Sequence, residues 1–112
     1  MGTAIDSTPD AQGHPSESLQ TLAAYLEIAL ERGKSVVLMR RDAEICSIYI
    51  GNPADEESEL SRRGTISKAV AEELLELTQV GLNRMTVGDQ TYRFFRSFTL
   101  ISNVGAVIFA LY

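Results

Sequence analysis

The dipeptide Gly88-Asp89 constrains the fold of this chain more than any other feature, because it separates two segments in which apolar and polar residues alternate. A two-residue loop that begins with glycine is typical of a tight β-hairpin, and alternation is the pattern of strands with one buried face. We therefore predict a pair of antiparallel strands at Leu82–Val87 and Gln90–Ser102. The chain is expected to contain an antiparallel sheet built outward from this hairpin.

The two-residue loop also determines which side chains of the hairpin share a face. Counting outward from the turn places Met85 opposite Tyr92, and both are expected on the face that packs against the core. Val87 and Phe94 belong to the same face. The opposite face is predicted to hold three cross-strand pairs, which are Leu82 with Phe95, Arg84 with Arg93, and Thr86 with Thr91. Regular alternation would also turn Arg96 toward the core face, unless a β-bulge near it interrupts the strand.

The remaining segments have the patterns of two helices and three further strands. Apolar residues recur at three- and four-residue spacing in the two predicted helices, which are Ser16–Arg32 and Thr65–Val80. A glycine follows each helix as a stop signal. The other predicted strands are Ser35–Arg40, Glu44–Gly51 and Ala106–Tyr112. The polar segment Gly51–Gly64 is predicted to be a long loop.

This order of elements, α-ββ-α-βββ, defines the expected fold. We predict an α+β domain over residues 16–112, in which two helices pack on a mainly antiparallel five-stranded sheet, preceded by a disordered tail over residues 1–15. The order resembles the roadblock and profilin-like α/β sandwich, and the segments that carry it are Leu19–Leu30, Val36–Ile50, Ile66–Leu77 and Met85–Leu111. The usual closing helix is missing. The resemblance implies a domain that dimerises and regulates GTPases or motors.

Composition points to a reducing, aqueous compartment. The 112 residues suffice for one domain with its own core. The single cysteine, Cys46, excludes an internal disulfide, and the polar N-terminal stretch lacks the apolar run of a secretory signal. The longest apolar run, Val104–Tyr112, is too short to span a bilayer. We therefore expect a cytoplasmic protein without a membrane partner, and the net charge of −5 disfavours nucleic acid as a partner.

No residue pattern in the chain indicates catalysis, a metal ion or a cofactor. The only histidine, His14, falls in the predicted tail, so no catalytic triad or dyad of fixed geometry can be built around it. Cys46 lies in an apolar strand pattern and is interpreted as a core residue rather than as a nucleophile. The acidic run Asp55–Glu59 lacks the spacing of a calcium loop, and no glycine-rich phosphate loop follows a strand. We accordingly expect a protein that is not an enzyme.

The most informative polar feature is the Arg84–Arg93 pair, because like charges directly opposite each other destabilise a sheet. A nearby carboxylate, from another subunit or from a helix, would relieve the repulsion. The candidate carboxylates on the predicted second helix are Glu72, Glu73 and Glu76. Alternatively the pair binds an acidic partner or an anion, since a guanidinium holds a carboxylate in a bidentate fork. Cationic, aromatic and apolar side chains together are typical of interfaces, which predicts a protein-interaction site at Arg84, Arg93, Leu82 and Phe95.

The predicted strands carry apolar residues on both faces, and two helices are too few to cover both sides of such a sheet. The last strand is therefore either a central strand between two layers or a strand that contacts a second subunit. We predict a non-enzymatic protein-interaction or regulatory module that forms a homodimer. Two alternatives stay open: a small acidic chaperone or adaptor for a protein client, and a ligand-sensing domain with a pocket between helix and sheet. A deep polar pocket would favour sensing, and a flat apolar patch would favour association.

Overall fold

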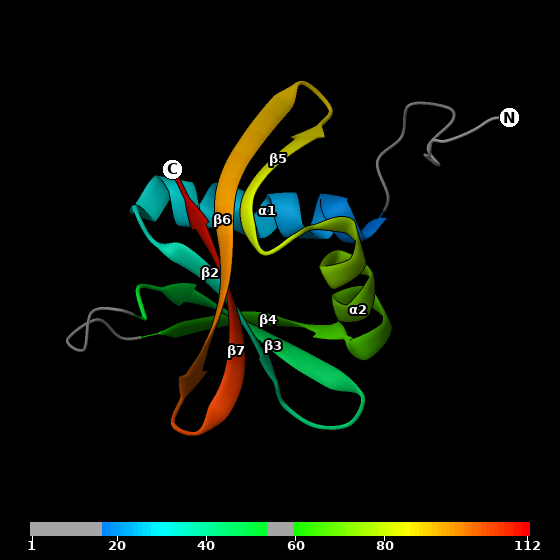
Figure 1. Cartoon of the computed structure of the whole chain (residues 1–112), viewed down its shortest axis with the longest axis vertical. Helices are drawn as coiled ribbons and strands as arrows, with labels where there is room; N and C mark the ends of the chain where they lie inside the picture. Colours follow the sequence, from blue (N-terminus) through cyan, green and yellow to red (C-terminus); the bar gives the residue numbers. More distant parts are fainter. Residues whose placement is uncertain (1–16, 54–59) are drawn as a thin grey trace, which may run out of the picture.

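A six-stranded antiparallel sheet forms the centre of the computed structural model, which describes residues 17–53 and 60–112 (Figure 1). The elements follow the chain as α1 (Glu17–Arg32), β2 (Ser35–Arg40), β3 (Ile45–Gly51), β4 (Ser61–Ser67), α2 (Lys68–Leu77), β5 (Gly81–Val87), β6 (Gln90–Ile101) and β7 (Val104–Leu111). The strands lie side by side in the order β4-β3-β2-β7-β6-β5. The chain therefore starts its sheet in the middle, at β2, and returns to the middle with β7.

The α+β class is confirmed, but the prediction of five strands is wrong. A sixth strand, β4, occupies Ser61–Ser67, where a loop and the start of a helix were predicted. It escapes the usual patterns because it lies at an edge of the sheet, and Ile66 is its one buried residue. Helix α2 consequently begins at Lys68 rather than at Thr65. Its N-cap is Ser67, whose Oγ accepts a hydrogen bond from the Val70 N–H at 3.2 Å.

The hairpin at Gly88-Asp89 has the predicted register. Met85 lies opposite Tyr92, and Arg84 lies opposite Arg93. Gly88 has a φ of 62°, a left-handed conformation that glycine adopts without steric cost. Strand β6 then continues without a register shift against both of its neighbours, so the proposed bulge near Arg96 is wrong. Arg96 therefore does turn toward the side of the sheet that carries the helices.

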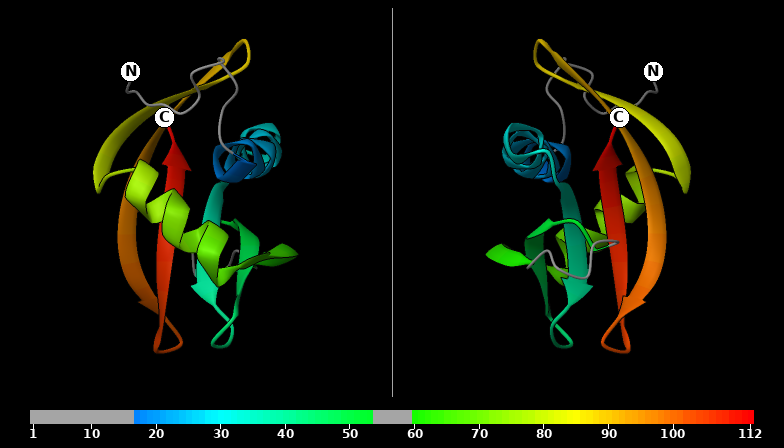
Figure 2. Two further views of the ribbon diagram at one scale, coloured as in Figure 1. Left: turned by 90° about the vertical axis from the view of Figure 1, so that its right-hand side faces the viewer. Right: turned by 90° about the vertical axis from the view of Figure 1, so that its left-hand side faces the viewer.

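A second two-residue turn joins β6 to β7. Ser102 and Asn103 both have positive φ values, 52° and 66°, as a type I′ hairpin turn requires. Because the turn is this tight, β7 starts at Val104, two residues before the predicted start. The β6–β7 and β2–β3 hairpins diverge at the ends that carry their turns (Figure 2). The upper part of the β5–β6 hairpin extends beyond the other strands (Figure 1).

Both helices pack on one face of the sheet. Their buried residues form a single core with strand residues of one alternation, such as Val36, Ile48 and Phe109. Phe94 and Phe109 meet edge to face at its centre, with ring centroids 5.5 Å apart. The members of this core with no more than 1% exposure are Leu22, Leu26, Ala29, Val36, Leu74, Phe94 and Phe109.

Two hydrogen bonds tie this layer together. The Ser18 hydroxyl of α1 donates to the Glu73 carboxylate of α2. The Tyr92 hydroxyl of β6 donates to Glu27 Oε2 of α1 at 2.5 Å. Burial, together with this hydrogen bond to a carboxylate, raises the pKa of Tyr92 to about 12. These two hydrogen bonds thus join α1 to α2 and α1 to β6.

Several predictions lie outside the described residues. They are the disordered tail over residues 1–15, with His14, and the acidic run over residues 55–59. Within residues 17–53 and 60–112, no helix is long and apolar enough to cross a membrane.

Candidate interaction surface

The face of the sheet turned away from the helices has no layer packed on it in the part of the chain that the structure describes. Its position follows from the strand registers, in which Val37 pairs with Tyr49 and with Ile108, and Ile108 pairs with Ser97. We call the following residues the open face: Ser35, Val37, Met39, Ile45, Ser47, Tyr49, Phe95, Ser97, Thr99, Ile101, Val104, Ala106, Ile108 and Ala110. It runs across β3, β2, β7 and the part of β6 that pairs with β7.

None of the open-face residues is charged. This is unusual, because an antiparallel sheet with one solvated face normally places its polar residues there. Its central residues Val37 and Ala106 are fully buried, whereas Phe95 is 46% exposed. A contiguous uncharged and largely apolar surface of this kind marks a site of protein association. Sequence reasoning found apolar residues on both faces of these strands but did not assemble them into one patch.

Arg84, Arg93, Leu82 and Phe95 come together at one end of this face, as predicted from the hairpin. Leu82 lies opposite Phe95 and both are exposed, at 59% and 46%. The two guanidinium groups are exposed, and no carboxylate of the described residues lies within ion-pair distance of either.

The second helix does not relieve the repulsion between the two arginines. Helix α2 lies on the other side of the sheet, where Glu72 forms an exposed ion pair with Lys68 at 3.9 Å and Glu73 accepts the bond from Ser18. Within one chain these helix carboxylates therefore do not compensate the pair, and compensation by those of a second copy stays a prediction. The two arginines remain available to a second molecule.

A separate apolar groove of about 360 Å³ lies on the helix side, between α2 and the β2–β3 and β6–β7 hairpins. Leu38, Leu75, Phe98 and Val107 form much of its wall. Cys46 also lines it but is only 8% exposed, which confirms its prediction as a buried residue. Burial raises the pKa of the Cys46 thiol, so the reactive thiolate is disfavoured.

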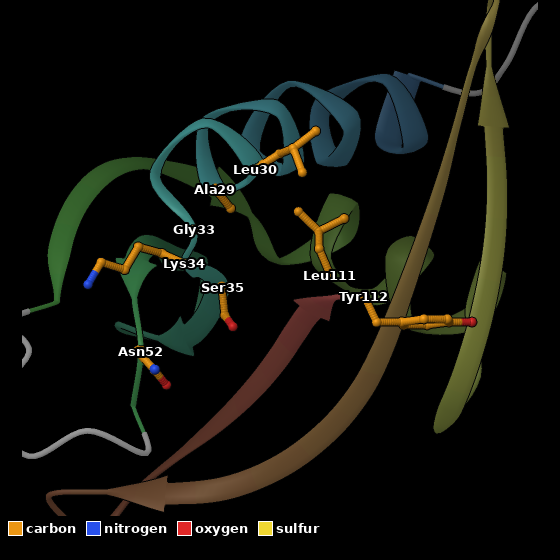
Figure 3. Close-up of a pocket in the computed structure, with 8 residues that line it drawn as sticks. All are labelled: Ala29, Leu30, Gly33, Lys34, Ser35, Asn52, Leu111 and Tyr112. Atoms are coloured by element: carbon orange, nitrogen blue, oxygen red, sulfur yellow. The ribbon is translucent and has the colours of Figure 1, made fainter.

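Other hollows of the described structure are somewhat smaller than this groove and about as open to solvent. One of about 270 Å³ lies where α1 ends beside the end of β7 (Figure 3). Leu30, Leu111 and Tyr112 form its apolar side, and the Lys34 ammonium group points away from them (Figure 3). Hollows this open to solvent enclose a small molecule less completely than typical ligand pockets do. The described residues also contain no group of three or more His, Cys, Asp and Glu side chains that could hold a metal ion.

No protein-family model, curated protein or solved structure significantly matches the chain. The resemblance to the roadblock and profilin-like sandwich thus has no match to support it. The functional argument consequently depends on the geometry of the surfaces just described.

Proposed function

We propose that this protein is a non-enzymatic interaction module that forms a homodimer by packing the open faces of two copies against each other. One observation carries the proposal: four neighbouring strands present an uncharged face with no covering layer among the described residues. Burying that face removes apolar side chains from water, the main driving force of association. A cytoplasmic setting is part of the proposal, and the single, buried thiol of Cys46 fits it.

The open face has the size of a small dimer interface. Four strands spaced ~4.8 Å apart, each about seven residues long at ~3.3 Å per residue, give a face of roughly 440 Å². Two such faces give a total of about 900 Å². Standard specific interfaces bury about 1,200–2,000 Å² in total, so this face belongs to the smaller class of weak, reversible associations.

A second copy suits this face because two uncharged open faces can meet without electrostatic repulsion between them. The net charge of −5 is located elsewhere on the chain, and salt screens it beyond roughly 8–10 Å. At the centre, Val37, Ser47 and Ala106 are small enough to let two sheets approach to the usual distance of ~10 Å. A chaperone or adaptor role would place a client protein on the same face, and the oligomeric state separates the two hypotheses. The ligand-sensing alternative would use the groove of about 360 Å³ between α2 and the sheet, which is open to solvent.

Two phenylalanines on the same strand provide a matched test. Phe95 lies on the open face and Phe98 on the helix side, and both are exposed, at 46% and 67%. The parent chain of 12.3 kDa is expected to sediment as a dimer at micromolar concentration. Phe95→Glu introduces a charge into the buried interface and should shift the equilibrium to monomer. Phe98→Glu should leave the dimer intact.

Sedimentation velocity at several concentrations measures this directly, and circular dichroism establishes that both variants keep the parent fold. A parent that stays monomeric at several hundred micromolar would refute the homodimer. An equal loss of dimer in both variants would contradict the assignment of the interface to the open face.

A further inference from the structure

The two edges of the sheet differ in how well they are protected against pairing with another strand. At β4 the register against β3 shifts, because Ile48 lies opposite Gly64 while Tyr49 lies opposite Arg62. Arg63 is left over as a bulge, a common device that prevents an edge strand from being extended. The other edge, β5, keeps a continuous register over all of its seven residues. By this comparison β5 is the edge that can accept a further strand.

The backbone groups that β5 offers follow from the turn. In a two-residue hairpin, Val87 and Gln90 form the closing hydrogen-bonded pair, so alternate residues from Thr86 backward direct their N–H and C=O groups away from β6. One of these groups is already occupied, because the Leu82 carbonyl accepts a hydrogen bond from Gln79 Nε2 at 2.8 Å. The outward groups of Arg84 and Thr86 have no such partner among the described residues. An added strand would therefore form its hydrogen bonds at these two residues.

The entry to β5 is held in place for such pairing. Asn83 Oδ1 accepts a hydrogen bond from the Gln79 N–H at 2.9 Å, and Asn83 Nδ2 donates to the Gln79 carbonyl at 2.7 Å. The same Nδ2 lies 3.0 Å from the Gly81 carbonyl. A preformed edge lowers the entropic cost that a binding strand must overcome.

The charges beside this edge select the kind of strand that fits. Arg84 and Arg93 form a non-hydrogen-bonded pair, in which side chains lie closest together, and neither has a carboxylate within ion-pair distance in the described residues. A second copy of β5 paired about Arg84 would align four guanidinium groups across the sheet, which disfavours self-pairing there. A strand with a carboxylate opposite Arg84 would instead neutralise the repulsion that the hairpin now contains.

We infer that β5 binds an extended segment of a partner protein that carries an acidic residue opposite Arg84 and an apolar residue opposite Leu82. The segment adds a seventh strand to the sheet through backbone hydrogen bonds at Arg84 and Thr86. This site uses the edge of the sheet and a different occupant from the dimer, so it stands even if the open face proves not to be an interface.

The test uses a fluorescent, end-capped peptide, Thr-Val-Glu-Val-Leu-Thr, which in the antiparallel direction places Glu opposite Arg84 and Leu opposite Leu82. Anisotropy should give saturable binding below 1 mM, and amide exchange at Arg84 and Thr86 should slow when the peptide is bound. Arg84→Glu should weaken binding at least tenfold, and Arg62→Glu on the opposite edge should change it less than twofold. A peptide with Lys in place of Glu should bind Arg84→Glu better than it binds the parent.

The Arg84→Glu variant is expected to fold, because it places a carboxylate opposite Arg93. A peptide N-methylated at its Glu loses the backbone donor that faces Arg84 and should bind at least tenfold more weakly. The inference is overturned if the parent does not bind the acidic peptide below 1 mM, if it binds the Lys peptide equally well, or if the N-methylated peptide retains its affinity. An equal loss in Arg62→Glu would show nonspecific charge attraction and would also overturn it.

Discussion

Removal of the Arg96 guanidinium is expected to destabilise the domain strongly, although Arg96 lies on a strand and is only half-buried. Its Nη1 reaches across to the end of α2 and lies 3.0 Å from the Leu75 carbonyl oxygen. The same nitrogen lies 3.1 Å from the Thr78 carbonyl oxygen and 2.8 Å from Thr78 Oγ1. Arg96 thus supplies a cation and hydrogen-bond donors at the helix end where carbonyl groups lack intrahelical partners.

The magnitude follows from these contacts. A hydrogen bond to a charged group contributes about 1.5–3 kcal/mol when fully formed in the interior, and interaction with the helix dipole adds ~0.3–1 kcal/mol. Because Arg96 is partly exposed and one donor nitrogen serves all three contacts, we expect Arg96→Ala to cost about 2–3 kcal/mol in total. For a domain of this size, that corresponds to a decrease in Tm of roughly 10–20 °C.

Arg93 provides the matched control on the same strand. It lies three residues earlier on the opposite side of the sheet, and its side chain has no ion pair among the described residues. Arg93→Ala should change the free energy of unfolding by no more than ~0.5 kcal/mol, and relief of the repulsion with Arg84 favours a slight gain. Urea and thermal unfolding of both variants measure the difference. A cost below ~0.5 kcal/mol for Arg96→Ala, or an equal cost for both, would refute the role of Arg96.

Three further predictions follow from the contacts around the core. The pKa of Tyr92 is raised from about 10 to about 12, so its protonated hydroxyl contributes up to ~2–3 kcal/mol to the free energy of unfolding. This stabilisation is complete below pH 10 and is lost as the pH rises through 12. Chemical unfolding across that range should show the loss in the parent and not in Tyr92→Phe. Gly64→Ala places a methyl group against the Tyr25 hydroxyl and should lower the free energy of unfolding by ~1–2 kcal/mol, measured by thermal unfolding. If Gly64→Ala costs as much in a Tyr25→Phe background as in the parent, this contact is not the cause. Cys46→Ala should lower the free energy of unfolding by ~1 kcal/mol or somewhat more. The thiol of the native protein should react with a thiol reagent far more slowly than that of the unfolded chain, and equal rates would contradict its burial.

The hairpin registers could be predicted because local chemistry determines them. Gly88-Asp89 fixes the pairing of Arg84 with Arg93 by counting alone, and the structure has that pairing. Strand β4 could not be predicted in the same way, because an edge strand with one buried residue has no alternation to detect. A polar segment with no strand pattern separates β4 from its partner β3 in the sequence. Strand β4 is therefore recognisable only from its pairing with β3 in the folded structure.

The open face could be predicted only in part. Apolar residues on both sides of β2, β3 and β7 are visible in the sequence, but which of them share one surface depends on the pairing of β2 with β7. That pairing brings Val37 beside Ile108, which is distant in the chain. The two edges likewise become distinguishable only when the bulge at Arg63 is placed against β3. Local alternation therefore predicts strands, whereas surfaces require the order of strands in the sheet.

The central claim is that the open face of the sheet forms the dimer interface. Intermolecular NOEs measure most directly which residues lie in that interface. A sample mixed from isotopically labelled and unlabelled chains reports only contacts between copies. The methyl groups of Ile108 and Val104, on the open face, should show such contacts at concentrations where the dimer forms. Contacts confined to Phe98 and Leu100, which are exposed on the helix side, would contradict the account.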